Sequence, residues 1–162
     1  SYRWDTFREP VAAGADNAGW YEMIGVQSTG HGPQSPIDIT YTDPAHPITK
    51  SLQPWTTINE ELYNNVQIFP TAKAVASGHQ LQYPRAKKGE PADPNAKPTE
   101  ASAVVAWTNE YGKKTRIFST TIGHNTETVA DARYLDLITR GLLWSTGNLS
   151  EDGTPTPGTT KP

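Results

Sequence analysis

The sequence has no cysteine among its 162 residues. This absence excludes disulfide bonds, thiolate metal sites and a thiol nucleophile within the chain. Basic residues are not in excess either, because 14 lysines and arginines face 17 aspartates and glutamates, for a formal net charge of −3. A surface that binds nucleic acid is normally basic, so the charge argues against a nucleic-acid partner.

Long apolar runs are also missing. Apolar residues make up only 35% of the chain, and no run of them is long enough to span a membrane. No signal peptide is visible, and the chain begins at Ser1 without a methionine. We therefore expect a processed form or part of a longer protein, for which an exported or periplasmic location is favoured over a cytoplasmic one.

What the sequence does contain can still build a core. Five tryptophans and seven tyrosines each bury a large area when they pack. The length predicts one domain, which we place at residues 1–147, with a tail or linker at 148–162. Fourteen prolines and thirteen glycines indicate long connections. The longest is predicted at Gly78–Ser102, and loops of this length are often functional.

Four strands are predicted from runs rich in β-branched and aromatic residues. Pro70 interrupts one of them, which indicates an edge strand or an irregular start. The last two are joined by a tight turn with a glycine and should form a hairpin. The four strands are predicted at Ile37–Tyr41, Val66–Ser77, Ala103–Tyr111 and Thr115–Gly123.

One strong helix follows the hairpin. Asp131 or Thr128 can cap its beginning, and Gly147 fits a left-handed stop after its end. Apolar residues at helical spacing predict the face that packs on a sheet. They are Tyr134, Leu135, Ile138, Leu142 and Leu143.

The strand that ends at Gly123 delivers His124 at its carboxyl end, just before this helix. Ligands of open α/β sheets bind at the carboxyl ends of strands. His124 is therefore a candidate general base, hydrogen-bond partner of a ligand, or metal ligand. The alternative is a histidine that only hydrogen-bonds the backbone of its loop, and residue type alone leaves both readings open.

The sequence from residue 103 to residue 147, "AVVAWTNEYGKKTRIFSTTIGHNTETVADARYLDLITRGLLWSTG", resembles the C-terminal part of the ThuA-like (trehalose utilisation) proteins. Their pattern is a strand with "A-W", a hairpin turn with "Y-G", a strand ending in "G-H", and a helix ending in "L-W-A-x-G". Upstream, "HPIT" at His46–Thr49 and "INEELY" at Ile58–Tyr63 are similar to that family's "HPI" and "E-E-L-Y" segments. The resemblance covers roughly Trp20 to Gly147.

This resemblance implies an α/β fold that is flavodoxin-like and similar to the class I glutamine amidotransferases. The family's opening βαβα portion would lie upstream of Ser1, so the fold is expected to be incomplete in this chain. A second chain or a missing segment would then complete the sheet. The resemblance also implies a bacterial protein of carbohydrate metabolism. Glutaminase activity is not carried over, because this chain has no cysteine nucleophile.

The resemblance also selects site residues. It places His124 at a position that faces the family's cleft, which favours a functional role. Glu61 aligns with a family glutamate and is preferred over Glu60, which we expect to be solvated. A carboxylate near a histidine can orient it, share a metal with it, or form an acid–base pair with it. Tyr63 could offer its phenol to a sugar or pack against the sheet.

Four further residues are candidates for binding a substrate. Arg3 lies where a family segment reaches the cleft, and it could bind an anionic group or form a surface ion pair. Trp55, in a proline-rich loop, is the best candidate for stacking on a sugar ring. His31 could line the cleft or simply be exposed, and Asn125 directly follows His124.

The leading hypothesis is a ThuA-like domain that binds or transforms a sugar or keto-sugar in a cleft at the carboxyl ends of the strands. His124 would move a proton, and Glu61 would orient the His124 ring or coordinate a metal. The histidines have no short metal-binding spacing, so no cofactor is evident, although a divalent metal is possible. The alternative hypothesis is a non-catalytic ThuA-like module for assembly or partner binding within a larger complex.

Overall fold

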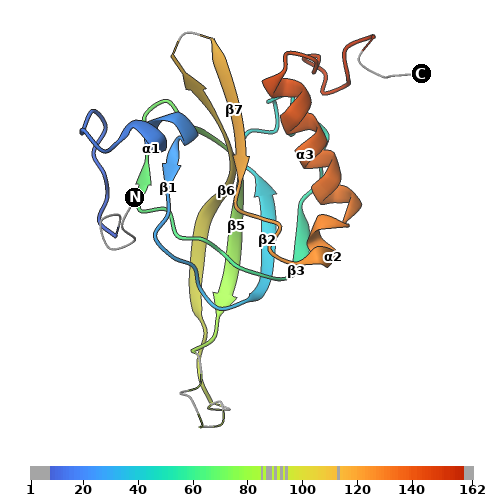
Figure 1. The fold of residues 1–162 in the computed structure, drawn as a ribbon. Helices are drawn as coiled ribbons and strands as arrows, with labels where there is room; N and C mark the ends of the chain where they lie inside the picture. Colours follow the sequence, from blue (N-terminus) through green and yellow to red (C-terminus); the bar gives the residue numbers. More distant parts are fainter. Residues whose placement is uncertain are drawn as a thin grey trace.

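The computed structural model describes residues 8–84, 86, 89, 91, 93, 95–112 and 114–158. Their centre is a five-stranded sheet in the order β3-β2-β5-β6-β7, in which every neighbouring pair is antiparallel (Figure 1). The strands are β2 (Ser35–Tyr41), β3 (Trp55–Glu60), β5 (Lys73–Gln82), β6 (Thr99–Tyr111) and β7 (Thr115–Thr120). The predicted hairpin of β6 and β7 is confirmed by their register.

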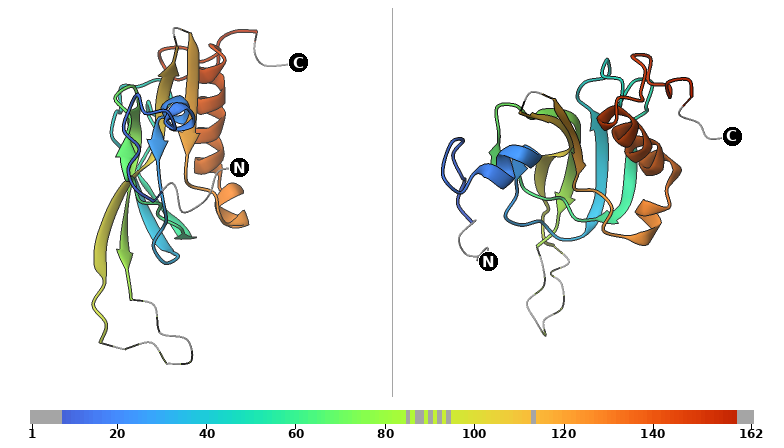
Figure 2. Two further views of the ribbon diagram at one scale, coloured as in Figure 1. Left: turned by 60° about the vertical axis from the view of Figure 1, so that its left-hand side comes forward. Right: turned by 45° about the horizontal axis from the view of Figure 1, so that its top comes forward.

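Helix α3 (Ala132–Ser145) covers one face of this sheet (Figure 2). The Asp131 side chain caps it by accepting a hydrogen bond of 2.8 Å from the backbone N–H of Arg133. This bond satisfies one of the amides that have no partner in the first turn of a helix. The helix packs tightly against β7 at Gly141, where an added Cβ would lie 2.2 Å from the ring of Phe118.

The main core lies between α3 and the sheet. Ile37 and Ile39 of β2 are buried while Asp38 between them is exposed, as expected for a strand with one covered face. Burial of such side chains contributes about 1.5–3 kcal/mol each. The buried residues of this core are Ile37, Ile39, Ile48, Trp55, Leu62, Val75, Ala76, Val105, Ala106, Ile122 and Leu137.

The apolar face predicted for α3 is partly wrong. Leu135 is exposed, and Leu142 has 63% of its surface exposed, whereas Leu137 and Gly141 are buried. Since residues four apart lie on the same face of a helix, the face that meets the sheet is centred on Leu137 and Gly141. A glycine carries no apolar signal in a sequence pattern, and its role here is to let Phe118 approach.

A small antiparallel ribbon lies beside the sheet. It pairs β1 (Val26–Gln27) with β4 (Gln67–Ile68), and α1 (Gly19–Ile24) leads into it. The pairing continues irregularly towards the site, because the backbone N–H of Asn64 donates to the Gly30 carbonyl and that of Gly32 donates to the Leu62 carbonyl. The ribbon therefore sets the loop after β1 against the chain that follows β3.

The segment predicted as a loop at Gly78–Ser102 is partly strand. Strand β5 runs on to Gln82 and β6 begins at Thr99, and these two residues pair in register. The extended hairpin projects beyond the rest of the sheet (Figures 1 and 2). The strands were not predicted here because the segment is polar, and backbone pairing between strands does not require an apolar face.

The expected fold class is shown in its coarser form, a mixed α/β domain with a curled antiparallel sheet. Among the residues that the structure describes, no parallel strand pair is present, so the parallel layering of a flavodoxin-like sheet is not seen there. No helix within the described residues has the length and apolar character needed to cross a membrane.

Candidate functional site

The candidate site forms where the chain leaving β3 meets the loop between β7 and α2 (Thr126–Val129). Glu60 ends β3, and Glu61 and Tyr63 follow it. His124 lies on the facing loop, directly after Gly123, whose φ of +118° favours glycine. An added Cβ at Gly123 would also lie 2.6 Å from the Tyr134 hydroxyl. The turn therefore depends on glycine at this position.

Glu60 holds the histidine loop in place. Its carboxylate accepts hydrogen bonds from the backbone N–H of His124 at 3.1 Å and of Asn125 at 3.0 Å. The expectation that Glu60 is solvated is wrong, since the residue is fully buried. A buried carboxylate is tolerated when backbone amides replace its water, and Glu60 has this arrangement at the beginning of α2.

Glu61 is the centre of the side-chain cluster, and only 8% of its surface is exposed. Its Oε2 accepts a hydrogen bond of 3.1 Å from the Tyr63 hydroxyl and lies 3.3 Å from His124 Nδ1. The same oxygen lies 3.6 Å from His31 Nε2, and Oε1 accepts a bond of 3.4 Å from the Gln34 amide. Two histidines and a phenol thus converge on one carboxylate oxygen.

The electrostatics of the cluster keep Glu61 charged. Burial raises its pKa, but hydrogen bonds from Gln34 and Tyr63 and the nearby His31 and His124 lower it, so the pKa lies below its usual value. Burial, together with the hydrogen bond to Glu61, raises the pKa of Tyr63. Near neutral pH the pair is therefore an ionised carboxylate and a protonated phenol.

His31 reaches the cluster through the ribbon, because it forms an isolated antiparallel bridge with Tyr63. The two rings lie with their centroids 5.1 Å apart. His31 Nδ1 is 2.8 Å from the carbonyl oxygen of Gly32. A carbonyl only accepts hydrogen bonds, so this contact requires the proton on Nδ1 and leaves Nε2 facing Glu61.

His124 and Asn125 are placed differently, although they are adjacent. The His124 side chain is 45% exposed and presents its ring to solvent beside Glu61. The Asn125 side-chain amide donates to the carbonyl oxygen of Asn59. Asn125 therefore ties its loop to β3 through both its side chain and its backbone N–H, whereas His124 keeps an accessible ring.

Of the other predicted substrate-binding residues, Trp55 does not join the cluster. The expectation for Trp55 is wrong: only 7% of its surface is exposed, and it packs in the main core at the start of β3. The Arg133 guanidinium also lies over its ring, 4.7 Å from the centroid. No face of this indole is available to stack on a sugar. Arg3 lies outside the described residues.

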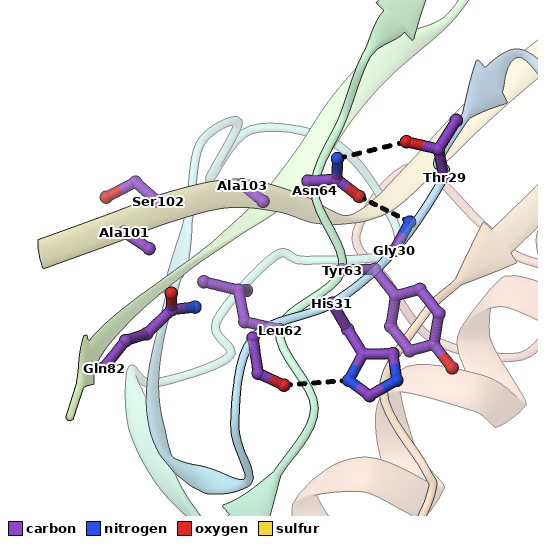
Figure 3. Close-up of a pocket in the computed structure, with 11 residues that line it drawn as sticks. Thr29, Gly30, His31, Leu62, Tyr63, Asn64, Gln82, Ala101, Ser102 and Ala103 are labelled. Atoms are coloured by element: carbon purple, nitrogen blue, oxygen red, sulfur yellow. Dashed lines mark hydrogen bonds between the residues drawn. The ribbon is translucent and has the colours of Figure 1, made fainter. Parts of the chain in front are cut away.

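A cavity of about 370 Å³ lies beside the cluster. Its size is at the lower end of the usual range for small-molecule sites. Figure 3 shows the Tyr63 hydroxyl pointing away from Ser102 and Gln82 on the other side of the cavity. Neither Glu61 nor His124 lines it. The lining residues are Thr29, Gly30, His31, Gly32, Leu62, Tyr63, Asn64, Gln82, Ala101, Ser102 and Ala103.

Sequence reasoning missed three residues of this region. Gln34 holds Glu61, Asn64 accepts hydrogen bonds from the Gly30 N–H and the Ser28 hydroxyl, and Gln82 lines the cavity. Amides in polar loops carry no local signal for a site. Within the part of the chain that the structure describes, no group of three or more His, Cys, Asp or Glu side chains is arranged to hold a metal ion.

The fold and the cluster define a mixed α/β domain whose buried carboxylate lies between two histidines at the end of its sheet. A family model described as ThuA, trehalose utilisation, matches residues 10–145. The chain belongs to the ThuA family, as its motifs predict. No curated protein and no solved structure matched the chain in the two other comparisons.

Proposed function

We propose that this ThuA-family chain binds a sugar or keto-sugar and moves a proton on it with His124 and Glu61. The family's description, trehalose utilisation, supports a carbohydrate ligand. The observation that carries the proposal is the convergence of His124, His31 and Tyr63 on Glu61 Oε2. Clusters in which a carboxylate orients a partly exposed histidine suit general acid–base work.

In this mechanism His124 Nε2 takes a proton from a sugar hydroxyl or from a carbon next to a keto group. Glu61 stays ionised, keeps the ring oriented through Nδ1, and stabilises the imidazolium that forms. Tyr63 and Gln34 fix the two oxygens of Glu61. Glu60 acts at a distance from the ligand, because it positions the loop that carries His124.

Proton exchange tests this proposal directly. The chain is incubated in D₂O with glucose, trehalose and keto-sugars, and NMR follows the loss of carbon-bound protons. We expect exchange in the wild type and a strong loss in His124→Ala. The matched control is His79→Ala, since His79 is also exposed and its Nε2 also faces a carboxylate, that of Glu100 at 3.9 Å. Equal rates in all three proteins would exclude His124 from the reaction.

A second candidate function is a non-catalytic module for assembly. The observation that favours it is the outer side of α2 and α3, where Val129, Leu135 and Leu142 are exposed. Leu135 and Leu142 are seven residues apart and lie on the same face of α3, and exposed apolar side chains on one face often mark protein interfaces. Under this proposal, the His124→Ala variant keeps full function, whereas Leu142→Glu reduces the assembly measured by light scattering.

A further inference from the structure

Strand β6 is longer than the strand that pairs with its outer edge, the edge that faces away from β5. It spans Thr99–Tyr111, but β7 pairs only with Ala106–Tyr111, and a backbone bond from Thr121 to Val105 ends the contact. Among the residues that the structure describes, no strand and no isolated bridge pairs with the outer edge from residue 99 to residue 104. This part of β6 is therefore an open sheet edge, to which a further strand can add.

The contacts of Val104 identify the backbone groups that face this edge. The backbone N–H of Val104 donates to Asn65 Oδ1, and its C=O accepts a hydrogen bond of 3.3 Å from Asn65 Nδ2. Both groups of Val104 thus point away from β5. Residues two apart in a strand face the same way, so Ser102 and Glu100 turn their backbone N–H and C=O groups to the same edge.

Asn65 already makes the contact that an added strand would make. Its side-chain amide offers an acceptor and a donor to one residue of β6, as a residue of a paired strand does. The next two positions in this row are Ser102 and Glu100, and both residues are exposed. No proline interrupts the row, and Glu100 is its only charged residue, so the edge lacks most of the features that prevent strand addition.

The cavity of about 370 Å³ opens along this edge. Figure 3 shows Ala101, Ser102 and Ala103 of β6 along one side of the cavity, and His31 and Tyr63 on the other. Successive side chains of a strand point to opposite sides, so every second side chain of an added strand would face this cavity. The walls contain no carboxylate, lysine or arginine, which favours uncharged side chains there.

We propose that the outer edge of β6 binds an extended segment of a partner protein, which adds to the sheet as a short strand in line with β7. The backbone of the segment would pair with Ser102 and Glu100, and its side chains that face the cavity would be uncharged. Residues 62–64 line the cavity opposite β6, so the space takes one strand rather than the sheet of a second copy. Neither His124 nor Glu61 lines this cavity, so the inference is independent of the proposed function.

Amide hydrogen exchange followed by NMR tests the edge residue by residue. In the free protein we expect fast exchange at Ser102 and Glu100 and slow exchange at Ala101 and Ala103, which pair with β5. The probes are short peptides in which valine and threonine alternate, made in both phases and with lysines at the ends for solubility. One phase should bind and slow the exchange of the Ser102 and Glu100 amides.

Two changes remove single hydrogen bonds from the added strand. N-methylation of a peptide amide that pairs with β6 should weaken binding about tenfold, the effect of one lost hydrogen bond. Ser102→Pro removes an edge N–H and should abolish binding while the protein stays folded, because proline is tolerated where the N–H faces away from the sheet. The matched control is Ala101→Pro, which removes an N–H that pairs with β5 and should lower the melting temperature.

Three outcomes would overturn the inference. Neither peptide binds, or a peptide binds without slowing exchange at Ser102 and Glu100, or N-methylation at every peptide amide leaves the affinity unchanged. Slow exchange at these two amides that depends on protein concentration would also overturn it, because a second copy would then occupy the edge. The exchange of sugar protons is measured separately, so these results leave the proposed function standing.

Discussion

Glu60 and Glu61 are neighbours in the sequence, and both are buried, but their carboxylates meet opposite kinds of partner. Glu60 faces the backbone amides of His124 and Asn125, whereas Glu61 faces the side chains of His31, His124 and Tyr63. Successive side chains of an extended chain point to opposite sides. One carboxylate therefore fixes the loop that carries the histidine, and the other meets the ring of that histidine.

This comparison separates two uses of a buried charge. Backbone amides cannot change protonation, so a carboxylate that they hold contributes stability and geometry. Imidazole and phenol groups can exchange protons, so a carboxylate among them can take part in chemistry. Removing each carboxylate in turn should therefore give opposite patterns of effect on stability and on proton transfer.

The largest expected effect is that of Glu60→Gln on stability. The glutamine NH₂ group would face backbone N–H donors, so at least one of the amides of His124 and Asn125 would lose its acceptor. Loss of a hydrogen bond to a buried charged group costs about 3 kcal/mol, which urea unfolding would measure. If Glu61→Gln lowers the unfolding free energy by the same amount or more, the contrast between the two carboxylates is wrong.

The next effect is that of Glu61→Gln on proton transfer. Without the charge, His124 loses the partner that orients its ring and stabilises its protonated form, so the exchange rate should fall about 100-fold. The unfolding free energy of Glu61→Gln should change by less than that of Glu60→Gln. Exchange at the wild-type rate in this variant would show that Glu61 does not act with His124.

A smaller effect is expected at Asp131, a third carboxylate, which holds a backbone amide at the surface. Asp131→Ala removes the cap of α3 and should lower the unfolding free energy by about 1 kcal/mol. The matched control is Asp136→Ala on the same helix. Asp136 pairs with Arg140 four residues later at 2.9 Å, and such a pair contributes only about 0.3–0.5 kcal/mol. Equal losses in the two variants would contradict the role of the cap.

The sequence predicts some of these features well. The helix of α3 and its cap follow from Asp131 and the apolar spacing, and the β6–β7 hairpin follows from its glycine turn. The pairing of Glu61 with His124 was expected from the family resemblance, and the structure brings the two side chains together. Local signals suffice where an element is defined by its own residues.

Other features depend on contacts that are distant in the sequence. His31 reaches Glu61 only because the irregular ribbon sets it opposite Tyr63. The burial of Glu60 depends on the loop that closes over it from residues 124 and 125, and nothing in "NEEL" distinguishes the two glutamates. Trp55 looked exposed among prolines, but it begins an edge strand whose inner face meets α3.

The smallest expected effect is the pH dependence of the Asp131 cap. The hydrogen bond from the Arg133 side chain, above all, lowers the pKa of Asp131 to about 2 from its usual 3.8. The pKa of this carboxyl is lower in the folded state than in the unfolded state. The ionised carboxylate therefore contributes its full share of the unfolding free energy above the unfolded-state pKa, and this contribution is lost as pH falls through the folded-state pKa. The stability gap between wild type and Asp131→Ala should thus be constant from about pH 7 to 5 and shrink towards about pH 2.

Urea unfolding of the wild type, Asp131→Ala and Glu61→Gln across this range would compare two carboxylates whose pKa values are lowered, Asp131 and Glu61. The pKa of Glu61 is also lowered, so its contribution should be lost in the same direction, as pH falls. For Asp131, a gap that widens on acidification would contradict the direction of its pKa shift, because protonation would then strengthen rather than remove the interaction. For Glu61, whose pKa is lowered, a gap that does not shrink as pH falls below about 4 would contradict the shift, and the acid–base pair would have to be reassigned.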